Sequence, residues 1–355
     1  MKPFSDLPAL SLIALVSRFD FTDTPDTTPD NPWIHNCNNN GGAPRFPKLN
    51  SFEDMGIRSS VLRGMFDYGF EKPSLVQKLA LFPLMHEQQV IVRARAGTGK
   101  TVVLGCALLH LADQSDQNIQ CLVLVPTREL AIGESHLFQN IGTYCGVRVG
   151  CLFGGAPLSD QKEAINNGKP QILVATPGRL LDFIQNGWIN LQNLKHLILD
   201  EADALFSHGF EPQLRAIIGR IKEDVRRGGA GETMKSKWFP FKFSIFSSTF
   251  PQDLMSLVQN HPNHAFDDHM YIDANPPQLL LGGDQFYVNC EKDEWKLDAL
   301  VDLIGEITCS TIVFCNTRKR LDWLVEHLKS KGLNAAGLSS VVNQNDQILK
   351  VRESI

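Results

Sequence analysis

The chain has 355 residues, 43% of them hydrophobic, and a formal net charge of −5. This length suits two domains of ordinary size, each with a full hydrophobic core. The negative net charge excludes a protein that binds nucleic acid through an overall basic surface, so an RNA or DNA partner has to be held at a local site.

The eight cysteines are scattered through the chain without Cys-x-x-Cys spacing. Several lie in apolar segments, where a thiol packs as a small hydrophobic side chain, and this favours a reducing compartment. We therefore expect an intracellular protein, cytoplasmic or nuclear. The apolar stretch at residues 8–16 is short and lacks a small-residue cleavage site, so it does not favour a secretory signal, and no segment has membrane-spanning length.

Residues 1–50 are expected to form a mostly disordered N-terminal extension. The stretch from Phe21 to Lys48 is rich in Asp, Thr, Pro and Asn and has almost nothing to bury. We expect order to begin near Phe52 and to continue with a helix through residues 61–66. Pro73 is expected to open the next helix at its first position.

A phosphate-binding loop is predicted at residues 94–101, which have the sequence Ala-Arg-Ala-Gly-Thr-Gly-Lys-Thr. An apolar strand, residues 90–92, precedes the loop, and an apolar helix, residues 102–109, follows it. Such a glycine loop gathers backbone N–H groups at the positive end of a helix dipole, where a polyphosphate can bind. The usual pattern begins with Gly where this chain has Ala94, so the loop alone leaves a simple glycine turn as an alternative.

Further apolar runs recur at intervals typical of alternating strands and helices: residues 121–125, 147–152, 171–175, 196–199 and 243–246. Each run ends at a polar or glycine-rich cluster. In an open parallel sheet the carboxyl ends of the strands share one edge, and ligands bind there. We therefore expect one binding edge, formed by residues 94–101, 126–131, 153–155, 176–179, 200–203 and 247–249.

Two later segments have compositions that occur at binding sites, but the sequence does not establish a binding role for them. Residues 223–242 are rich in Lys, Arg and Gly and contain Trp238, a composition that can contact nucleic acid but is more often solvated or meets a protein partner. We expect His261, His264 and His269 to be surface residues, because no Cys or carboxylate pattern accompanies them. No structural metal is therefore predicted.

A linker is expected at residues 274–284, around Pro276-Pro277 and Gly282-Gly283. It separates a complete α/β domain at residues 51–273 from a partial one at residues 285–355. The partial domain alternates strands and helices, predicted in order at residues 285–289, 293–307, 310–315, 319–331, 333–338 and 346–353.

The expected edge carries the groups of a nucleotide-hydrolysing site. Lys100 is placed to reach the β- and γ-phosphates of a nucleotide, and the Thr101 hydroxyl to bind Mg²⁺. Asp200 is placed to hold the same ion, usually through water. Glu201 beside it can accept a proton from the attacking water, which completes the site.

The sequence Asp200-Glu201-Ala202-Asp203 after Leu197-Ile198-Leu199 resembles the signature of the DEAD-box RNA-dependent ATPases. The other clusters follow that family's order and spacing. Residues 69–77, with Phe52 upstream, resemble the Q motif, and residues 94–101 resemble motif I, where the family itself has Ala first. Residues 126–131, 154–155, 176–179, 247–249 and 312–317 are similar to motif Ia, the GG element and motifs Ib, III and IV.

The sequence around Trp295 is most similar to the branch of translation initiation factor four-A. The resemblance implies two RecA-like domains, each a parallel sheet with helices on both faces, of which the second is incomplete. It implies ATP and Mg²⁺ as cofactors, with Thr101 and Asp200 at the ion and Lys100, Asp200 and Glu201 as catalytic residues. The implied ATP contacts are Phe70, Gln77 at the adenine, Ala96, Gly97, Thr98, Gly99, Lys100 and Thr101. A packed core aromatic is an equally good interpretation of Phe70 or Phe52.

The resemblance further implies a link from ATP to RNA through Asp203, Ser247 and Thr249. Single-stranded or short duplex RNA would be held by its backbone, without base specificity. The implied RNA contacts are Pro126, Arg128, Gly154, Gly155, Thr176 and Arg179. Residues 223–242 and the N-terminal extension are candidates for protein partners, and no membrane partner is expected.

Two late motifs of the family are not found in this sequence: one of Ala-Arg-Gly-x-Asp type and one of His-Arg-x-Gly-Arg-x-x-Arg type that holds arginine fingers. An arginine finger contributes roughly a thousandfold or more to phosphoryl transfer, so we expect this chain to bind ATP and hydrolyse it poorly. Two functions therefore stay open. One is an ATP-dependent RNA helicase; the other is a catalytically weak pseudo-helicase or truncated isoform that acts as an ATP- and RNA-binding regulator.

Overall fold

The computed structural model describes residues 34–36, 49–86, 89–227, 241–250, 269–275, 287–290, 292, 294–307 and 311–339. They belong to two compact units, which divide between residues 277 and 278. The larger unit is built on an eight-stranded sheet of order β1-β8-β2-β7-β6-β3-β5-β4. Its strands are β1 (Ile34–Asn36), β2 (Gln89–Arg93), β3 (Cys121–Leu124), β4 (Val149–Leu152), β5 (Ile172–Ala175), β6 (His196–Leu199), β7 (Lys242–Ser247) and β8 (His269–Asp273).

All strand pairs from β8 to β4 are parallel, and β1 runs antiparallel to β8. Strands β2, β3, β5, β6 and β7 are almost entirely buried, which explains why they are mainly apolar in the sequence. In β2, for example, Val90 and Val92 belong to one hydrophobic core and Ile91 to the other. The predicted parallel sheet is therefore confirmed.

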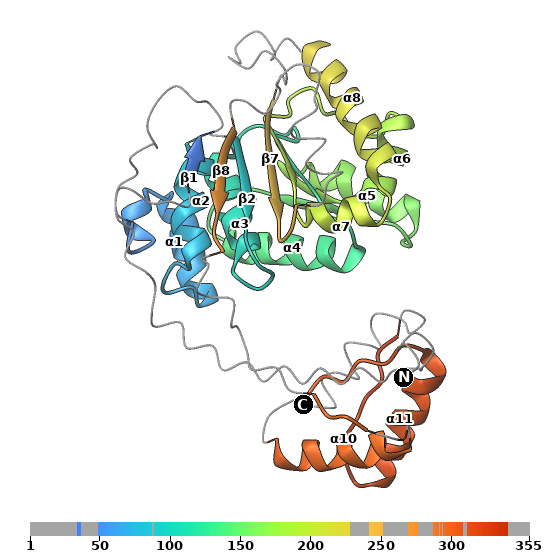
Figure 1. The fold of residues 1–355 in the computed structure, drawn as a ribbon. Coiled ribbons are helices and arrows are strands. Elements are labelled where there is room, and N and C mark those ends of the chain that lie inside the picture. Colours follow the sequence, from blue (N-terminus) through green and yellow to red (C-terminus); the bar gives the residue numbers. More distant parts are fainter. Residues whose placement is uncertain are drawn as a thin grey trace. The chain divides into compact units, whose positions relative to one another are not determined.

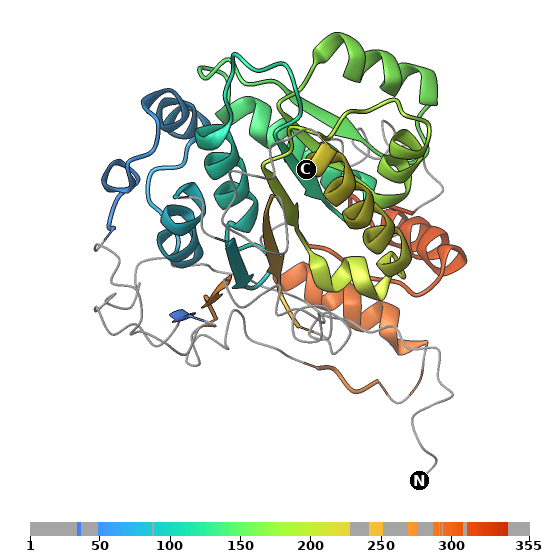
Figure 2. The same cartoon turned by 90° about the horizontal axis from the view of Figure 1, so that it is seen from above.

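Helices cover both faces of this sheet (Figures 1 and 2). The helices on the first core are α1 (Ser59–Tyr68), α2 (Leu75–Met85), α3 (Lys100–Leu111) and α4 (Arg128–Ile141), preceded by the short 3-10 helix η2 (Glu53–Met55). Those on the second core are α5 (Leu158–Gly168), α6 (Pro177–Gln185), α7 (Ala202–Ser207) and α8 (Glu211–Arg227). None of the described helices is long and apolar enough to cross a membrane.

Helix α2 begins differently from the prediction. Pro73 was expected at its first position, but the helix begins at Leu75, with Ser74 as its N-cap. Ser74 and Gln77 form a capping box, in which the Gln77 Oε1 accepts from the Ser74 backbone N–H at 2.8 Å. This pair satisfies N–H groups at the helix end, so it sets the start of the helix and leaves Pro73 in the preceding turn.

Strand β1 lies within the N-terminal extension that we expected to be mostly disordered; the rest of residues 1–48 lies outside the described residues. His269 was predicted at the surface, which is wrong: it is 0% exposed in β8, and its Nε2 is 2.7 Å from the Phe243 carbonyl oxygen. His261, His264 and Trp238 lie outside the described residues.

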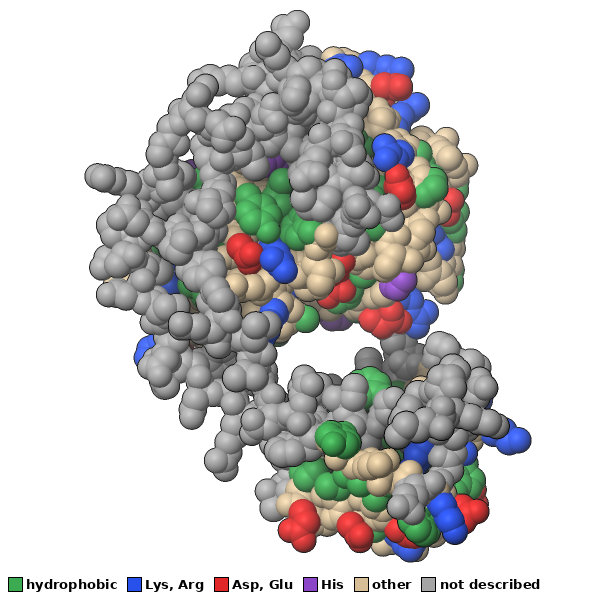
Figure 3. All heavy atoms as spheres, in the orientation of Figure 1, with side chains coloured by type: hydrophobic (Ala, Val, Ile, Leu, Met, Phe, Trp, Pro, Cys, Tyr) green, Lys and Arg blue, Asp and Glu red, His purple; other side chains and the backbone are tan. Residues whose placement is uncertain are grey.

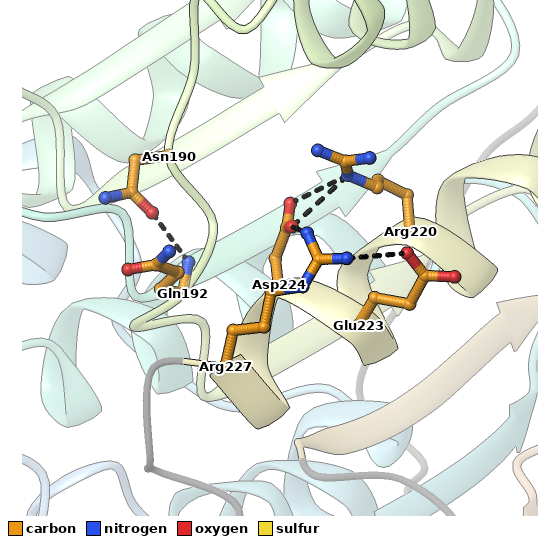
Figure 4. Close-up of polar contacts among 6 residues, drawn as sticks. All are labelled: Asn190, Gln192, Arg220, Glu223, Asp224 and Arg227. Carbon is orange, nitrogen blue, oxygen red and sulfur yellow. Dashed lines mark hydrogen bonds and ion pairs between the residues drawn. The ribbon is translucent and has the colours of Figure 1, made fainter.

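The exposed end of α8 carries ion pairs between neighbouring turns of the helix (Figure 4). Arg220 lies 3.2 Å from Asp224, and Arg227 lies 3.7 Å from Glu223 and 3.8 Å from Asp224. Exposed pairs of this kind stabilise a helix by only about 0.3–0.5 kcal/mol each. The stability of α8 therefore depends mainly on its buried apolar face, residues Leu214, Ile217, Ile221 and Val225.

The smaller unit contains α10 (Trp295–Glu306) and α11 (Arg318–Ser330), which pack through Leu300, Leu324 and Leu328. Both helices match predicted ones. The strands predicted at residues 285–289, 310–315 and 333–338 are wrong within the described residues 287–289, 311–315 and 333–338, which form no strand. The predicted helix at residues 346–353 lies outside the described residues.

The missing strands have a physical reason. Side chains still alternate as in a strand, since Val313 and Cys315 pack on the helices while Ile312 and Phe314 are exposed. A strand also needs a ladder of backbone hydrogen bonds to a neighbouring segment, and no strand ladder is found among the described residues of this unit. Apolar alternation alone was therefore not enough to predict a strand.

His196, at the start of β6, is expected to make the folded state sensitive to acid. It is 4% exposed, and burial, with smaller contributions from Lys242 and Lys195, lowers its pKa from 6.5 to about 4. The folded protein thus holds this imidazole neutral while the unfolded chain protonates it first. Its contribution to stability is present above about pH 6.5 and is lost as the pH falls towards 4, a loss of about 2 kcal/mol at pH 5 and about 3 kcal/mol in full.

Replacing His196 by Gln removes this titration. We expect the free energy of unfolding, measured by urea denaturation at about pH 7 and about pH 5, to fall by about 2 kcal/mol less in His196→Gln than in wild type. His136→Gln, at an exposed position on α4, is the control and should behave as wild type. An identical pH dependence in His196→Gln and wild type would show that His196 is not the group responsible.

Candidate functional site

The loop after β2 lies at the carboxyl edge of the sheet, beside β7. The Ala94 backbone N–H donates to the Ser247 carbonyl oxygen at 3.0 Å, which ties the start of the loop to the end of β7. Gly97 and Gly99 have φ angles of +76° and +98°, a conformation that favours glycine. Ala94 is not among the residues with positive φ, so this first position of the loop does not need glycine.

Lys100, the first residue of α3, folds back over this loop. Its buried Nζ donates to the carbonyl oxygens of Ala94 at 2.7 Å and Arg95 at 2.9 Å. Burial lowers the pKa of Lys100, while the nearby carboxylates of Asp200, Glu201 and Asp203 act to raise it. The ammonium group therefore lies between the loop and an acidic cluster, within reach of whatever the loop binds.

The start of α2 is held against the same loop. The Ser74 hydroxyl donates to the Thr98 carbonyl oxygen at 2.7 Å, and the buried Gln77 amide donates to the Gly99 carbonyl oxygen at 3.4 Å. Gly99 has a φ of +98° and a Cβ added to it would lie 2.5 Å from the Gln77 Nε2, so a side chain there would strain the backbone and displace the Gln77 amide. The assignment of Gln77 to adenine stays a prediction; the structure places its amide between the cap of α2 and the phosphate loop.

The two phenylalanines considered for the base differ in burial. Phe52 is 0% exposed and belongs to the first hydrophobic core, so it is a packed core residue. Phe70 is only partly buried and stacks with the exposed Tyr68, with ring centroids 5.3 Å apart. Of the two, Phe70 therefore has an aromatic surface that a ligand can reach.

The acidic pair follows β6. Asp200 is 2% exposed, its backbone N–H donates to the Leu124 carbonyl oxygen at 3.0 Å, and its Oδ1 accepts from the Glu201 N–H at 2.9 Å. Burial raises the pKa of Asp200, although the neighbouring Glu134 and the hydrogen bond from the Glu201 N–H oppose the rise. Burial and the charge of Asp200 raise the pKa of Glu201.

Glu201 also has an unusual backbone conformation. Its φ of 47° and ψ of 48° place it in the left-handed region, as the N-cap residue of α7. A non-glycine residue there costs roughly 1–2 kcal/mol, and such strain tends to occur at functional sites.

Asp203 joins α7 to the end of β7. The Asp203 Oδ2 accepts hydrogen bonds from the Thr249 N–H at 3.0 Å, the Thr249 hydroxyl at 2.9 Å and the Ser248 hydroxyl. The Asp203 N–H donates to the Ser247 hydroxyl at 3.1 Å. Burial acts to raise the pKa of Asp203, but these hydrogen bonds outweigh it and the net pKa is lowered. The sequence prediction that Asp203, Ser247 and Thr249 form one group agrees with this geometry, with Ser248 added.

The predicted RNA contacts lie beyond β3, β4 and β5, on the other half of the same edge. Arg128 pairs with Glu129 at 3.0 Å, and its guanidinium lies within 3.4 Å of a Cβ built at Gly155. Arg179 donates to the Ala156 carbonyl oxygen at 3.0 Å and to Gln161 at 2.8 Å. Gly154 is exposed, whereas Thr176 and Pro126 are buried.

Sequence reasoning missed two residues of this edge. Gln161, on α5, connects Arg179 to the Phe153 carbonyl oxygen, to which it donates at 3.1 Å; nothing in the sequence indicated this. Glu134 lies beside Asp200. The burial of Glu134 was predictable from the sequence, because α4 buries Ala131, Phe138 and Ile141 at helical spacing and Glu134 falls on that apolar face.

The residues at this edge fit a nucleotide with Mg²⁺. The hydroxyl of Thr101 and the carboxylate of Asp200 are the hard oxygen ligands that Mg²⁺ prefers. Within the ranges described above, no three His, Cys, Asp or Glu side chains form a cluster able to hold a metal ion. This suits an ion that takes one or two protein ligands and completes its shell with water and phosphate oxygens.

Comparison with known proteins gives consistent matches. Residues 74–257 match the DEAD/DEAH box helicase family model. The chain is 32% identical to the ATP-dependent RNA helicase eIF4A of Chaetomium globosum, over 86% of this chain and 72% of that protein, and 34% identical to the eukaryotic initiation factor 4A of Cryptosporidium parvum, over 85% and 70%.

Solved structures are similar as well. A DEAD box protein from the hyperthermophile Methanococcus jannaschii matches with a TM-score of 0.57 at 25% identity, covering 86% of this chain and 77% of that one. A variant of S. cerevisiae Dbp5, bound to a Gle1 variant and IP6, matches with a TM-score of 0.66 at 24% identity, covering 87% and 72%. These likenesses confirm the predicted α/β, RecA-like fold.

Proposed function

The chain belongs to the DEAD/DEAH box helicase family, and from this premise we propose that it is an ATP-dependent RNA helicase that locally unwinds or remodels RNA. Two RecA-like domains, at residues 51–273 and 285–355, would close on single-stranded RNA when ATP binds. The observation that carries the proposal is the shared edge of the larger unit, where the phosphate loop, the Asp200-Glu201 pair and the Asp203 group meet.

In the proposed reaction Lys100 binds the β- and γ-phosphates of ATP, exchanging its bonds to loop carbonyls for phosphate oxygens. Thr101 and Asp200 would hold Mg²⁺, which neutralises charge that develops on the phosphates. Glu201 accepts the proton of the attacking water. Its raised pKa brings it closer to the working pH than that of a free glutamate, which makes it a better-matched base.

The Asp203 group would carry the state of the nucleotide to the RNA. Asp203 follows the Asp200-Glu201 pair directly, and Ser247 bonds both to Asp203 and, through its carbonyl oxygen, to the phosphate loop. A shift of the loop on hydrolysis would therefore also move the end of β7 and α7. Arg128 and Arg179 would grip the RNA sugar-phosphate backbone, which gives affinity without base specificity.

RNA binding through a few local arginines agrees with the overall charge. On the face seen in Figure 3, Lys and Arg side chains are interspersed with Asp and Glu side chains. We expect binding to weaken with salt in proportion to the few phosphates contacted.

Protein partners would bind residues 223–242 or the N-terminal extension. An intracellular location, cytoplasmic or nuclear, follows from the scattered cysteines.

The test is ATP hydrolysis by the 355-residue chain with and without single-stranded RNA, together with binding of fluorescent ATP and GTP analogues. We expect RNA to stimulate turnover and ATP, but not GTP, to compete for the site, because the proposed adenine contact is the Gln77 amide. Gln77→Ala should reduce this preference. Equal binding of ATP and GTP would contradict the assignment of Gln77.

A second candidate is a regulator that binds ATP and RNA with little turnover. Its premise is that the family motif of His-Arg-x-Gly-Arg-x-x-Arg type, which holds the arginine fingers, is not found in residues 1–355. The same assay separates the two: tight ATP and RNA binding with turnover lower by roughly a thousandfold than in family helicases favours the regulator. RNA-stimulated turnover at an ordinary rate would exclude it.

A further inference from the structure

Tyr68, the last residue of α1, is an aromatic residue to which the proposed function gives no role. Its side chain is large and apolar, yet the residue is 50% exposed. Its ring stacks on that of Phe70, with the ring centroids 5.3 Å apart and the ring planes inclined by 24°. Phe70 in turn is partly buried and packs against the first hydrophobic core. The two rings therefore form a stacked pair, in which Phe70 is the inner ring and Tyr68 the outer one.

The turn at the end of α1 brings the two rings together. The Gly69 N–H donates to the Phe66 carbonyl oxygen at 2.9 Å. The Phe70 N–H donates to the Met65 carbonyl oxygen at 3.0 Å. These are the two hydrogen bonds of a Schellman motif, in which Gly69 takes the left-handed conformation with a φ of 102°. The motif fixes the backbone on both sides of Gly69, but it does not fix the side-chain torsions of Phe70, which the contact with Tyr68 restricts.

Phe70 lies a few residues before the start of α2, which is tied to the phosphate loop. The Ser74 hydroxyl and the Gln77 amide donate to carbonyl oxygens of that loop. A nucleotide with its phosphates in the loop would therefore carry its base towards residues 70–77. In this position the orientation of the Phe70 ring decides how much aromatic surface meets the base.

We propose that Tyr68 is a positioning residue that holds the Phe70 ring in the orientation that receives the base of ATP. The proposal rests on the proposed function, because that function assigns Phe70 to ATP. Tyr68 does not have to touch the nucleotide. It would act by ordering the Phe70 side chain before ATP binds, so that this ordering no longer opposes binding.

The expected effect follows from the strength of a stacked aromatic pair, which corresponds to a factor of about 2 to 10 in an equilibrium constant. We therefore expect Tyr68→Ala to raise the Kd for ATP about two- to tenfold, measured by isothermal titration of the 355-residue chain. Tyr68→Phe keeps the stacked ring and should bind ATP as wild type does.

Two further measurements separate positioning of Phe70 from damage to the fold. Inorganic tripolyphosphate has phosphates like those of ATP but no base, so wild type and Tyr68→Ala should bind it equally. In a double-mutant cycle, Tyr68→Ala should not weaken ATP binding further once Phe70→Ala is present, because Tyr68 acts through Phe70.

Tyr144→Ala is the matched control for the loss of an exposed tyrosine that contacts α1. Tyr144 is 41% exposed, and the Arg63 guanidinium on α1 lies 4.0 Å from the centre of its ring. This variant removes a contact of α1 without removing a ring of the stacked pair, so its ATP affinity should equal that of wild type. Equal weakening in Tyr144→Ala and Tyr68→Ala would show that the position of α1 matters rather than the stacked ring, and would overturn the inference.

The other contrary results are equally definite. Wild-type ATP affinity in Tyr68→Ala or in Phe70→Ala, weakened ATP binding in Tyr68→Phe, an equal loss of tripolyphosphate binding, or additive effects in the double mutant would each overturn the inference. If the wild-type chain binds neither ATP nor tripolyphosphate, the proposed function fails and the inference fails with it. If the wild-type chain binds both and Tyr68→Ala binds ATP equally well, only the inference is lost.

Discussion

Replacing Glu201 by Gln is expected to lower the RNA-stimulated rate of ATP hydrolysis by a factor of about 10² to 10⁴ while leaving ATP affinity close to wild type. Gln has nearly the same shape, so the left-handed turn at this position and the hydrogen bond from its N–H to Asp200 are kept. What is lost is the carboxylate that takes the proton of the attacking water. Steady-state hydrolysis and equilibrium binding of an ATP analogue together check this.

The pH profile gives a second readout for the same change. A base works only when deprotonated, so hydrolysis should fall as the pH falls through the pKa of Glu201. Burial and Asp200 raise that pKa, so the acid limb of the wild-type profile should lie above the usual range for glutamate. Glu201→Gln should lack this limb.

Glu211→Gln is the matched control. Glu211 begins α8, is partly exposed and pairs with Arg215 at 2.7 Å. This variant should hydrolyse ATP as wild type does. Wild-type turnover in Glu201→Gln would exclude Glu201 as the base, and a loss of ATP affinity as large as the loss of turnover would make it a binding residue.

Much of the candidate site was predictable because a parallel sheet imposes its own geometry. Once residues 196–199 and 243–246 were recognised as buried strands, the residues after them had to share one edge. Asp203 and Ser247 are 44 positions apart in the sequence. They are hydrogen-bonded because Asp203 follows β6 and Ser247 ends β7, and these two strands are parallel neighbours. The polar residues that follow the apolar runs therefore predicted that Asp203, Ser247 and Thr249 lie together, without any knowledge of side-chain contacts.

What the sequence did not predict depends on contacts between elements. The Glu134–Asp200 contact requires the rotation of α4 over the sheet, and the Gln161–Arg179 bond requires α5 to face α6. Burial of His269 follows from the position of β8 between β1 and β2, although two aspartates come directly before it in the sequence. Periodicity within one segment does not contain this information.

The largest loss of ATP affinity is expected for Lys100→Ala. The substitution removes the cation that would bind the phosphates and also the two bonds, at 2.7 and 2.9 Å, that hold the carbonyl oxygens of Ala94 and Arg95. Hydrogen bonds to charged groups contribute about 1.5–3 kcal/mol each, so ATP affinity should fall at least roughly tenfold. Loss of one preorganised donor to the transition state should lower hydrolysis by a further factor of about 10² to 10³.

Two comparison variants separate charge from geometry in this prediction. Lys100→Arg keeps the charge, but a planar guanidinium does not match a buried position shaped by two carbonyl oxygens, so we expect it not to restore hydrolysis. Lys195→Ala removes an exposed lysine at the opposite edge of the sheet, just before β6, and should leave ATP binding and hydrolysis unchanged. Isothermal titration with ATP and steady-state hydrolysis measure both effects. Wild-type turnover in Lys100→Ala would mean that phosphate chemistry does not take place at residues 94–101, where Lys100 lies near the carboxylates of Asp200, Glu201 and Asp203.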